Sequence, residues 1–113
     1  MNQKSQVEIA AIYYPGFHPD PHFSAWYGPE WSEWELVKKG KPLYPGHHQP
    51  KEPEWGHFDE SDPTWAVKQI DLAADHGITA FMFDWYWYNG VQLFHNALEK
   101  GFLKASNNER LKF

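Results

Sequence analysis

Residues 78–90, which read I-T-A-F-M-F-D-W-Y-W-Y-N-G, decide the fold of this 113-residue chain. The first six residues form a continuous apolar run, which is typical of a strand that is buried on both faces of a parallel sheet. Asp84 ends that run, and four large aromatic residues, an amide and a glycine follow it. In α/β folds, ligands bind at the carboxyl ends of the strands. The stretch therefore predicts a buried strand with a polar, aromatic end that faces a ligand.

The segment before this strand predicts a helix. Asp62 is suited to cap its N-terminus, Pro63 to occupy its first position and Gly77 to close it. The apolar residues between them recur at helical spacing and form one stripe: Ala66, Val67, Ile70, Ala73 and Ala74. Further upstream, residues 7–14 predict a first strand, because they are mostly β-branched, apolar or aromatic and are followed by Pro15 and Gly16.

Beyond the turn at Asn89 and Gly90, a second helix is predicted over residues 91–105, although Gly101 weakens its last turn. Residues 111–113 predict the start of a third strand. Alternating strands and helices imply a parallel sheet with right-handed crossovers. We therefore expect an α/β fold: residues 1–113 form about two βα units, the N-terminal part of a (β/α)8 TIM-barrel-like domain, and the remainder of the barrel is required for folding. The alternative is a doubly wound nucleotide-binding fold, but the first strand runs into Y-P-G-F-H-P and not into a glycine-rich phosphate turn.

A long loop is predicted over residues 16–61, which show no sustained periodicity. Loops of this length are usually functional or disordered. The chain is 19% aromatic, with much of its tryptophan in this segment. Disordered segments are poor in aromatic residues, so we expect an ordered, functional loop with a short helix near residues 30–38.

Composition excludes several classes of protein. The formal net charge is −5, which disfavours binding to the phosphate backbone of nucleic acids. The chain has no cysteine, so it has neither disulfides nor thiolate metal sites. No apolar run approaches the roughly 20 residues of a membrane span, and the polar start at residues 1–6 does not resemble a signal peptide. The expected location is therefore cytoplasmic.

Polar and aromatic side chains gather in three places that a barrel would bring to one face: the end of the first strand, the long loop and the end of the second strand. Aromatic faces beside carboxylates, amides and imidazoles suit a sugar, whose C–H face packs on a ring while its hydroxyls take hydrogen bonds. The predicted substrate is therefore a glycan or glycoconjugate. The candidate substrate-binding residues are Tyr14, His18, Trp31, Glu33, Trp34, His48, Gln49, Asp84, Tyr86, Trp87 and Asn89.

Each candidate also has a purely structural interpretation. Asp84 could cap a helix or pair with a cation, and Glu33 could be a solvated carboxylate, although together they would make the carboxylate pair that glycosidases use. Successive side chains of a strand point to opposite faces, so only one of the sets Trp85/Trp87 and Tyr86/Tyr88 is expected to face the ligand. Neighbouring His47 and His48 point in different directions, so no metal is expected, and no cofactor either.

Three motifs carry a family resemblance: I-Y-Y-P-G-F-H-P at residues 12–19, W-S-E-W-E-L-V-K-K-G-K-P-L-Y-P-G-H-H-Q-P at 31–50, and F-D-W-Y-W-Y-N-G at 83–90. Together they resemble the N-terminal part of the WbsX-like family, over almost the whole chain from about residue 9 to 113. That family is related to glycoside hydrolase family 99 and is often described as a lipopolysaccharide-biosynthesis glycosyltransferase. The resemblance implies a (β/α)8 barrel that acts on glycans. In family 99 hydrolases the catalytic glutamates lie in later strands, and no position here matches that motif.

The sequence is compatible with two functions. The first is the N-terminal part of a glycan-processing enzyme that hydrolyses or transfers glycosidic bonds in polysaccharide or lipopolysaccharide metabolism. Its catalytic residues would lie downstream of Phe113, so the fragment alone would be inactive. The alternative is a carbohydrate-binding or assembly module without turnover.

Overall fold

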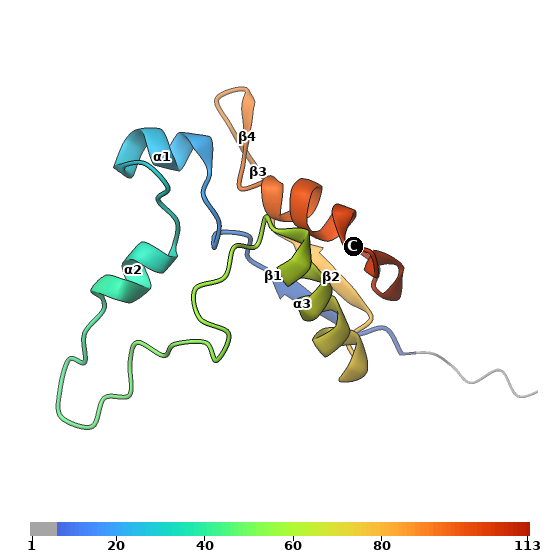
Figure 1. Cartoon of the computed structure of the whole chain (residues 1–113), viewed down its shortest axis with the longest axis horizontal. Helices are drawn as coiled ribbons and strands as arrows, with labels where there is room; N and C mark the ends of the chain where they lie inside the picture. Colours follow the sequence, from blue (N-terminus) through green and yellow to red (C-terminus); the bar gives the residue numbers. More distant parts are fainter. Residues whose placement is uncertain (1–6) are drawn as a thin grey trace, which may run out of the picture.

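A computed structural model describes residues 7–113 of the chain (Figure 1). The polar start at residues 1–6, on which the prediction about a signal peptide rests, lies outside the described residues. The elements follow one another as β1 (Ala10–Tyr13), α1 (Pro21–Tyr27), α2 (Trp34–Lys39), α3 (Pro63–Asp75), β2 (Ala80–Phe83), β3 (Tyr86–Tyr88), β4 (Val91–Leu93), the π-helical turn η1 (Ala97–Gly101) and the 3₁₀ turns η2 (Phe102–Lys104) and η3 (Asn108–Arg110).

The predicted parallel pairing is present between β1 and β2. Ala10 lies opposite Ala80, and the register continues to Tyr13 opposite Phe83. Ala80 also forms a parallel bridge with Lys112, whose backbone N–H donates to the Thr79 carbonyl at 2.9 Å. Strand β2 therefore lies between β1 and the backbone at Lys112, and all three run in the same direction.

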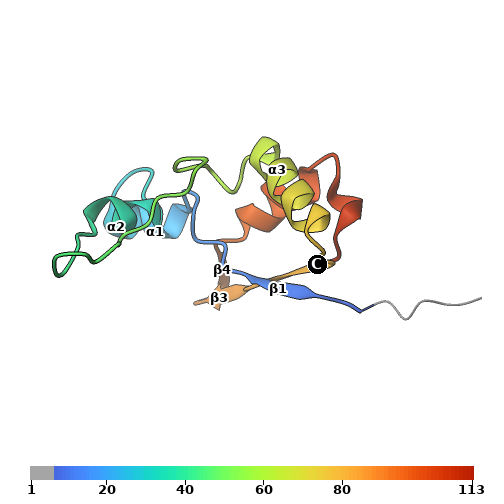
Figure 2. The same ribbon diagram turned by 90° about the horizontal axis from the view of Figure 1, so that it is seen from below.

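The two faces of the β1–β2 sheet differ. Residues at odd positions, such as Phe81 and Tyr13, pack against α3 and the C-terminal helical turns, which lie together on one side of the strands (Figure 2). Residues at even positions point to the other face by strand alternation. There Ile12 is 76% exposed and Met82 is 57% exposed. An apolar face of a parallel sheet is thus left uncovered by residues 7–113.

Helix α3 begins as its sequence predicts. The Asp62 carboxylate accepts the Thr64 N–H at 2.9 Å, and Pro63 occupies the first turn. Gly77 follows the helix with a φ of +92°, a conformation that residues with a side chain rarely adopt. The apolar stripe of α3 enters the core, whose buried members are Ala66, Ile70, Ala73, Phe81, Phe102, Ala105 and Leu111.

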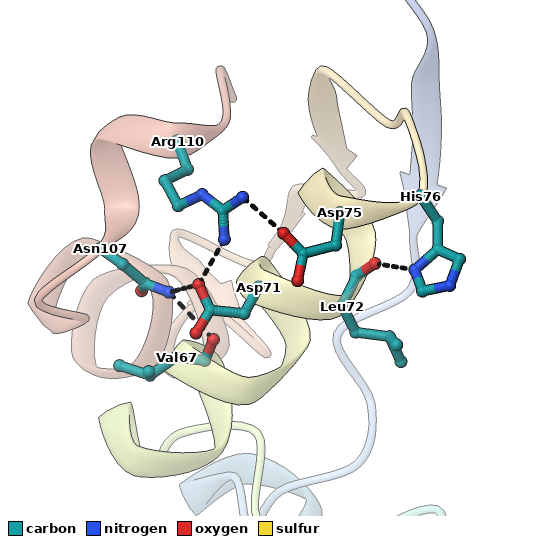
Figure 3. A network of polar contacts seen from close by, with 7 residues as sticks. All are labelled: Val67, Asp71, Leu72, Asp75, His76, Asn107 and Arg110. Carbon is teal, nitrogen blue, oxygen red and sulfur yellow. Dashed lines mark hydrogen bonds and ion pairs between the residues drawn. The ribbon is translucent and has the colours of Figure 1, made fainter.

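A polar network ties the outer face of α3 to the C-terminal turns (Figure 3). The Arg110 guanidinium reaches Asp71 at 2.6 Å and Asp75 at 2.7 Å, two carboxylates one helical turn apart. The Asn107 amide donates to Asp71 and to the Val67 carbonyl. These contacts fix the end of the described chain against α3, where Leu111 completes the core.

The prediction of a helix over residues 91–105 is wrong for its first residues, which form strand β4. Asn89 and Gly90 have φ angles of +47° and +83°, as a two-residue hairpin turn of type I′ requires. The turn returns the chain as β4, which pairs antiparallel with β3. A positive φ of 56° at Phe94 then redirects the chain into the helical turns. The apolar spacing of Val91, Phe94 and Leu98 imitates a helix across two different elements.

Gly101 has a packing role in addition to its effect on the helix. A Cβ atom at this position would lie 2.2 Å from the backbone carbonyl oxygen of Glu60. The last π-helical turn therefore approaches the backbone of the long segment as closely as a glycine permits.

The segment at residues 16–61 contains two helices and is not one uninterrupted loop. Helix α2 overlaps the short helix expected near residues 30–38. Helix α1 was not predicted, although Asp20 and Pro21 repeat the N-cap and first-turn signal of Asp62 and Pro63. Asp20 is buried, and its second carboxylate oxygen accepts the Phe94 N–H at 2.9 Å. The carboxylate thus links α1 to the end of the β3–β4 hairpin.

Candidate functional site

Four of the predicted site residues come together at the carboxyl ends of β1 and β2. The Tyr14 hydroxyl donates to Glu33 Oε1 at 2.9 Å, and the Tyr86 hydroxyl donates to Asp84 Oδ2 at 3.2 Å. The two phenol rings meet edge to face, with centroids 6.4 Å apart. We call these four residues the tyrosine–carboxylate cluster.

The strands position two members of the cluster. Tyr14 follows β1 directly and Asp84 follows β2 directly. The Asp84 N–H donates to the Tyr13 carbonyl at 3.0 Å, so the pairing of the strands continues one residue past the assigned ends. Strand alternation then directs the side chains of Tyr14 and Asp84 to the open face, on the same side as Ile12 and Met82.

Gly16 brings the long segment to this place. The Glu33 N–H donates to the Gly16 carbonyl at 3.1 Å. A Cβ atom at residue 16 would lie 2.5 Å from the Tyr14 ring and 2.7 Å from Glu33 Cγ. Only glycine therefore allows the tyrosine and the glutamate to approach each other in this arrangement.

The electrostatics of the cluster keep both phenols protonated. Burial raises the pKa of Tyr14, and its hydrogen bond to Glu33 and the charge of that carboxylate raise it further. Burial and the Asp84 carboxylate raise the pKa of Tyr86. Both hydroxyls therefore act as donors that orient a carboxylate. Among residues 7–113, the second oxygen of Glu33 and that of Asp84 accept no hydrogen bond, so both can accept one from a ligand.

Aromatic rings surround these polar groups. Phe94 lies edge-on to Tyr14 at 6.0 Å and to Tyr86 at 6.0 Å, and Phe17 lies edge-on to Tyr14 at 6.2 Å. The cluster thus presents hydrogen-bond acceptors against aromatic surfaces. This combination can orient a hydroxylated ligand by its polar groups while its C–H groups pack against rings.

Glu60 is a buried carboxylate that binds the backbone of Phe17, and it is not among the predicted site residues. Its side chain is buried, its Oε2 accepts the Phe17 N–H at 3.1 Å, and its own N–H donates to the Phe17 carbonyl at 3.2 Å. Burial is the main cause that raises the pKa of Glu60 to about 7, and the charge of Asp59 adds to the effect. Its charge in turn contributes to the raised pKa of Tyr14. The sequence D-E-S-D gave no signal that only this carboxylate would be buried.

Three predicted residues lie inside the folded segment rather than at an open surface. His18 is fully buried, burial lowers its pKa, and within the described chain both ring nitrogens lack a hydrogen-bond partner. Trp31 stacks on Phe23 with ring centroids 5.5 Å apart. The Trp34 indole N–H donates to the Phe58 carbonyl at 2.7 Å. Their observed contacts are structural.

The remaining four predicted residues lie outside the cluster, on the loop beyond α2, in the hairpin turn and on the opposite face of β3. His48 and Gln49 are exposed on the loop beyond α2, which lies away from the strands (Figure 1). Asn89 is exposed in the hairpin turn. Trp87 is 61% exposed and stacks with Trp85, on the opposite face of β3 from Tyr86. Of the two alternating sets, the tyrosines therefore face the cluster side, as the contact of Tyr86 with Tyr14 demonstrates.

Residues 7–113 contain no group of three or more His, Asp or Glu side chains arranged to hold a metal ion. In the same range, no helix has both the length and the apolar character needed to cross a membrane.

Comparison with known proteins supports the family resemblance. Residues 9–113 match the family model described as glycosyltransferase WbsX. Two proteins described as uncharacterized protein WxcX, from the B100 and ATCC 33913 strains of Xanthomonas campestris pv. campestris, are each 38% identical to the chain over 86 residues. The aligned region covers 75% of this chain and only 12% of each relative. No solved structure matches the chain significantly. Since the family model covers nearly the entire sequence, the chain belongs to the glycosyltransferase WbsX family.

Proposed function

We propose that this chain is the first part of a (β/α)8 barrel domain that processes glycans, and that the tyrosine–carboxylate cluster binds a sugar of the substrate. The observation that carries the proposal is the position of the cluster. Two carboxylates, each oriented by a phenol, stand at the carboxyl ends of adjacent parallel strands. Barrel enzymes place their active sites at this end.

The sheet supports the barrel part of the proposal. Its three parallel segments follow the chain order β1, β2 and the backbone at Lys112, with helices packed on one face. The other face carries Ile12 and Met82, which are apolar and uncovered within residues 7–113. In a barrel this face would point to the interior, where bulky apolar side chains form layers, and Tyr14 and Asp84 would stand at the upper rim of that interior.

The chemistry of the cluster supports a sugar ligand. A sugar hydroxyl can donate to a carboxylate oxygen, and charge-assisted hydrogen bonds of this kind are stronger than neutral ones. Aromatic rings beside the carboxylates suit the C–H face of a pyranose. The family model is described as a glycosyltransferase. The resemblance of the sequence motifs to a family related to glycoside hydrolase family 99 is the reason for including hydrolysis as the other reaction type. Transfer and hydrolysis are both included in the proposal, with the acid and base groups supplied by the part of the protein after Phe113.

A binding experiment on the full-length protein tests the proposal. A glycan array that includes manno-, gluco-, galacto- and rhamno-oligosaccharides identifies a ligand, which is then titrated into Glu33→Gln, Asp84→Asn and the unchanged protein. We expect at least tenfold weaker binding by both variants, with melting temperatures close to that of the unchanged protein. Glu54→Gln, which alters an exposed carboxylate of the long segment, is the matched control. Unaltered affinity in both site variants, or a large loss of stability with unaltered affinity, would make the two carboxylates structural.

A further inference from the structure

A hollow lies between α1 and the β3–β4 hairpin. It has a volume of about 450 Å³ and is lined by α1 residues Pro21 and His22, by Trp87, Val91 and Gln92 of the hairpin, and by His95. Cavities of about 300–1,000 Å³ are typical of sites for small molecules. The hollow is therefore large enough for a compact ligand.

The pairing of β3 with β4 places an indole and an amide side by side in this hollow. Trp87 and Gln92 are directly opposite each other in the β3–β4 register, so their side chains lie on the same face of the hairpin. Tyr86 and Leu93 are the neighbouring pair and lie on the opposite face. Tyr86 belongs to the tyrosine–carboxylate cluster, so this tyrosine and the Trp87–Gln92 pair lie on opposite faces of the hairpin.

The indole is unusually accessible. Trp87 is 61% exposed and Trp85, two residues earlier on the same face, is 56% exposed. Their rings are nearly parallel, with an interplanar angle of 18° and centroids 5.7 Å apart. Two adjacent exposed indoles, one on β3 and one just before it, form a large apolar surface, and such surfaces mark interaction sites.

The polar groups of the hollow select the class of ligand. Gln92 offers donors and an acceptor, and His22 adds its ring nitrogens. At His95 only Nε2 is left for a ligand, because its Nδ1 is buried. Among the residues that the structure describes, no Asp, Glu, Lys or Arg lines the hollow. The lining therefore suits a ligand that is uncharged, rich in hydroxyl groups and flat enough on one side to pack on an indole.

We infer that the hollow between α1 and the β3–β4 hairpin is a second sugar-binding site, which takes a neutral pyranose residue on Trp87 with its hydroxyls bonded to Gln92. This inference rests on the proposed function, because it assigns the same class of ligand to a second place. The pyranose is either a remote residue of the glycan bound at the cluster or part of a second glycan molecule.

Calorimetry and saturation-transfer NMR on the full-length protein test the inference, with D-mannose, D-glucose, D-galactose and L-rhamnose and with the oligosaccharide selected on the array as probes. The variants are Trp87→Ala, Trp87→Phe, Gln92→Ala and Asp84→Asn, with Tyr44→Ala as the control for loss of an exposed aromatic side chain elsewhere. In Asp84→Asn we expect monosaccharide binding to persist, and in the double variant with Trp87→Ala we expect it to disappear. Trp87→Ala and Gln92→Ala should each weaken this persisting binding at least fivefold, whereas Trp87→Phe should retain most of it and Tyr44→Ala all of it.

The outcomes separate the two proposals. If Trp87→Ala weakens a single oligosaccharide-binding event, the two sites hold one glycan; if it removes one of two independent binding events, they hold two. Equal binding by Trp87→Ala, Gln92→Ala and the unchanged protein overturns the second site and leaves the cluster intact. Binding that needs Trp87 but is indifferent to Glu33→Gln and Asp84→Asn overturns the cluster and keeps the hollow. Absence of binding of every probe to the unchanged protein overturns both.

Discussion

The buried carboxylate of Asp20 accepts the backbone N–H of Phe94 at 2.9 Å, across 74 residues of chain. Its other oxygen accepts the N–H groups of His22 and Phe23 at the start of α1. This one side chain thus caps α1 in the long segment and also binds the backbone of Phe94, the first residue after β4. Asp20 therefore connects α1 to the β3–β4 hairpin, the two elements that lie beside the candidate sites.

Replacing Asp20 by alanine should therefore destabilise the protein by about 2–4 kcal/mol, because it removes a helix cap and leaves the Phe94 N–H buried without a partner. Asp62→Ala is the matched control, since Asp62 caps α3 without a long-range hydrogen bond, and it should cost only about 1 kcal/mol. Denaturant unfolding of the full-length protein measures both changes. Equal losses in the two variants would show that the bond to Phe94 contributes nothing.

Glu60 should make stability depend on pH in the direction opposite to that of an ordinary ion-paired carboxylate. Its pKa is raised from 4.5 to about 7 in the folded protein, so between these values the folded state binds a proton that the unfolded state does not. Its contribution is greatest below pH 4.5, falls as the pH rises to about 7 and is constant above that. The total change is about 3 kcal/mol.

The variant Glu60→Gln isolates this effect because its amide is uncharged at every pH. Unfolding free energies of the full-length variant and of the unchanged protein are compared at pH 5 and pH 8. The glutamine variant should gain stability relative to the unchanged protein at the higher pH, whereas Glu54→Gln, in an exposed position, should show no such change. A constant difference across this range would mean that Glu60 titrates as it does in the unfolded chain.

Gly101→Ala should destabilise the protein although alanine is the better helix former. The added Cβ would lie 2.2 Å from the Glu60 carbonyl oxygen, a backbone atom that a side-chain rotation cannot move away. The expected loss is about 1–3 kcal/mol. Lys100→Ala, an exposed position in the same helical turn, should be nearly neutral. A gain in the melting temperature of Gly101→Ala would show that the turn and the long segment are not in contact.

Met82→Lys tests whether the open face of the sheet is covered in the full-length protein. If the remainder of a barrel encloses it, a lysine there is buried without a partner, and the loss should be at least about 3 kcal/mol. Leu43→Lys on the loop beyond α2, where the side chain is exposed, should change stability little. Equal tolerance of the two lysines would mean that water reaches the face that carries Ile12 and Met82.

The sequence predicts the elements that local signals specify. Asp62, Pro63 and Gly77 mark both ends of α3, and the apolar run after Gly77 locates β2. The same Asp-Pro signal at residues 20 and 21 does not suffice to predict α1, because this helix has only seven residues and too few turns for a periodic apolar stripe. Asn89 and Gly90 predict a turn, but no signal predicts the strand after it. Its three residues are too few to display alternation.

The candidate site was predicted where it depends on the strands, and less well where it depends on tertiary contacts. Tyr14 and Asp84 follow from the ends of β1 and β2, whereas the hydrogen bond of Glu33 to Tyr14 required a close approach at Gly16 that spacing does not encode. Trp34 resembled a ligand-binding aromatic residue, but its indole N–H is used by the Phe58 carbonyl. Burial of Glu60 arises only when the long segment packs on Phe17, so its neighbours in sequence could not reveal it.

We propose above that the tyrosine–carboxylate cluster binds the sugar of the substrate. A crystal structure of the full-length protein with the oligosaccharide selected on the array tests it most directly. We expect a pyranose with hydroxyl oxygens within about 3 Å of the free carboxylate oxygens of Glu33 and Asp84, beside the rings of Tyr14 and Tyr86. A bound glycan that touches neither carboxylate, with both still held by their tyrosines and turned away from it, would contradict the claim.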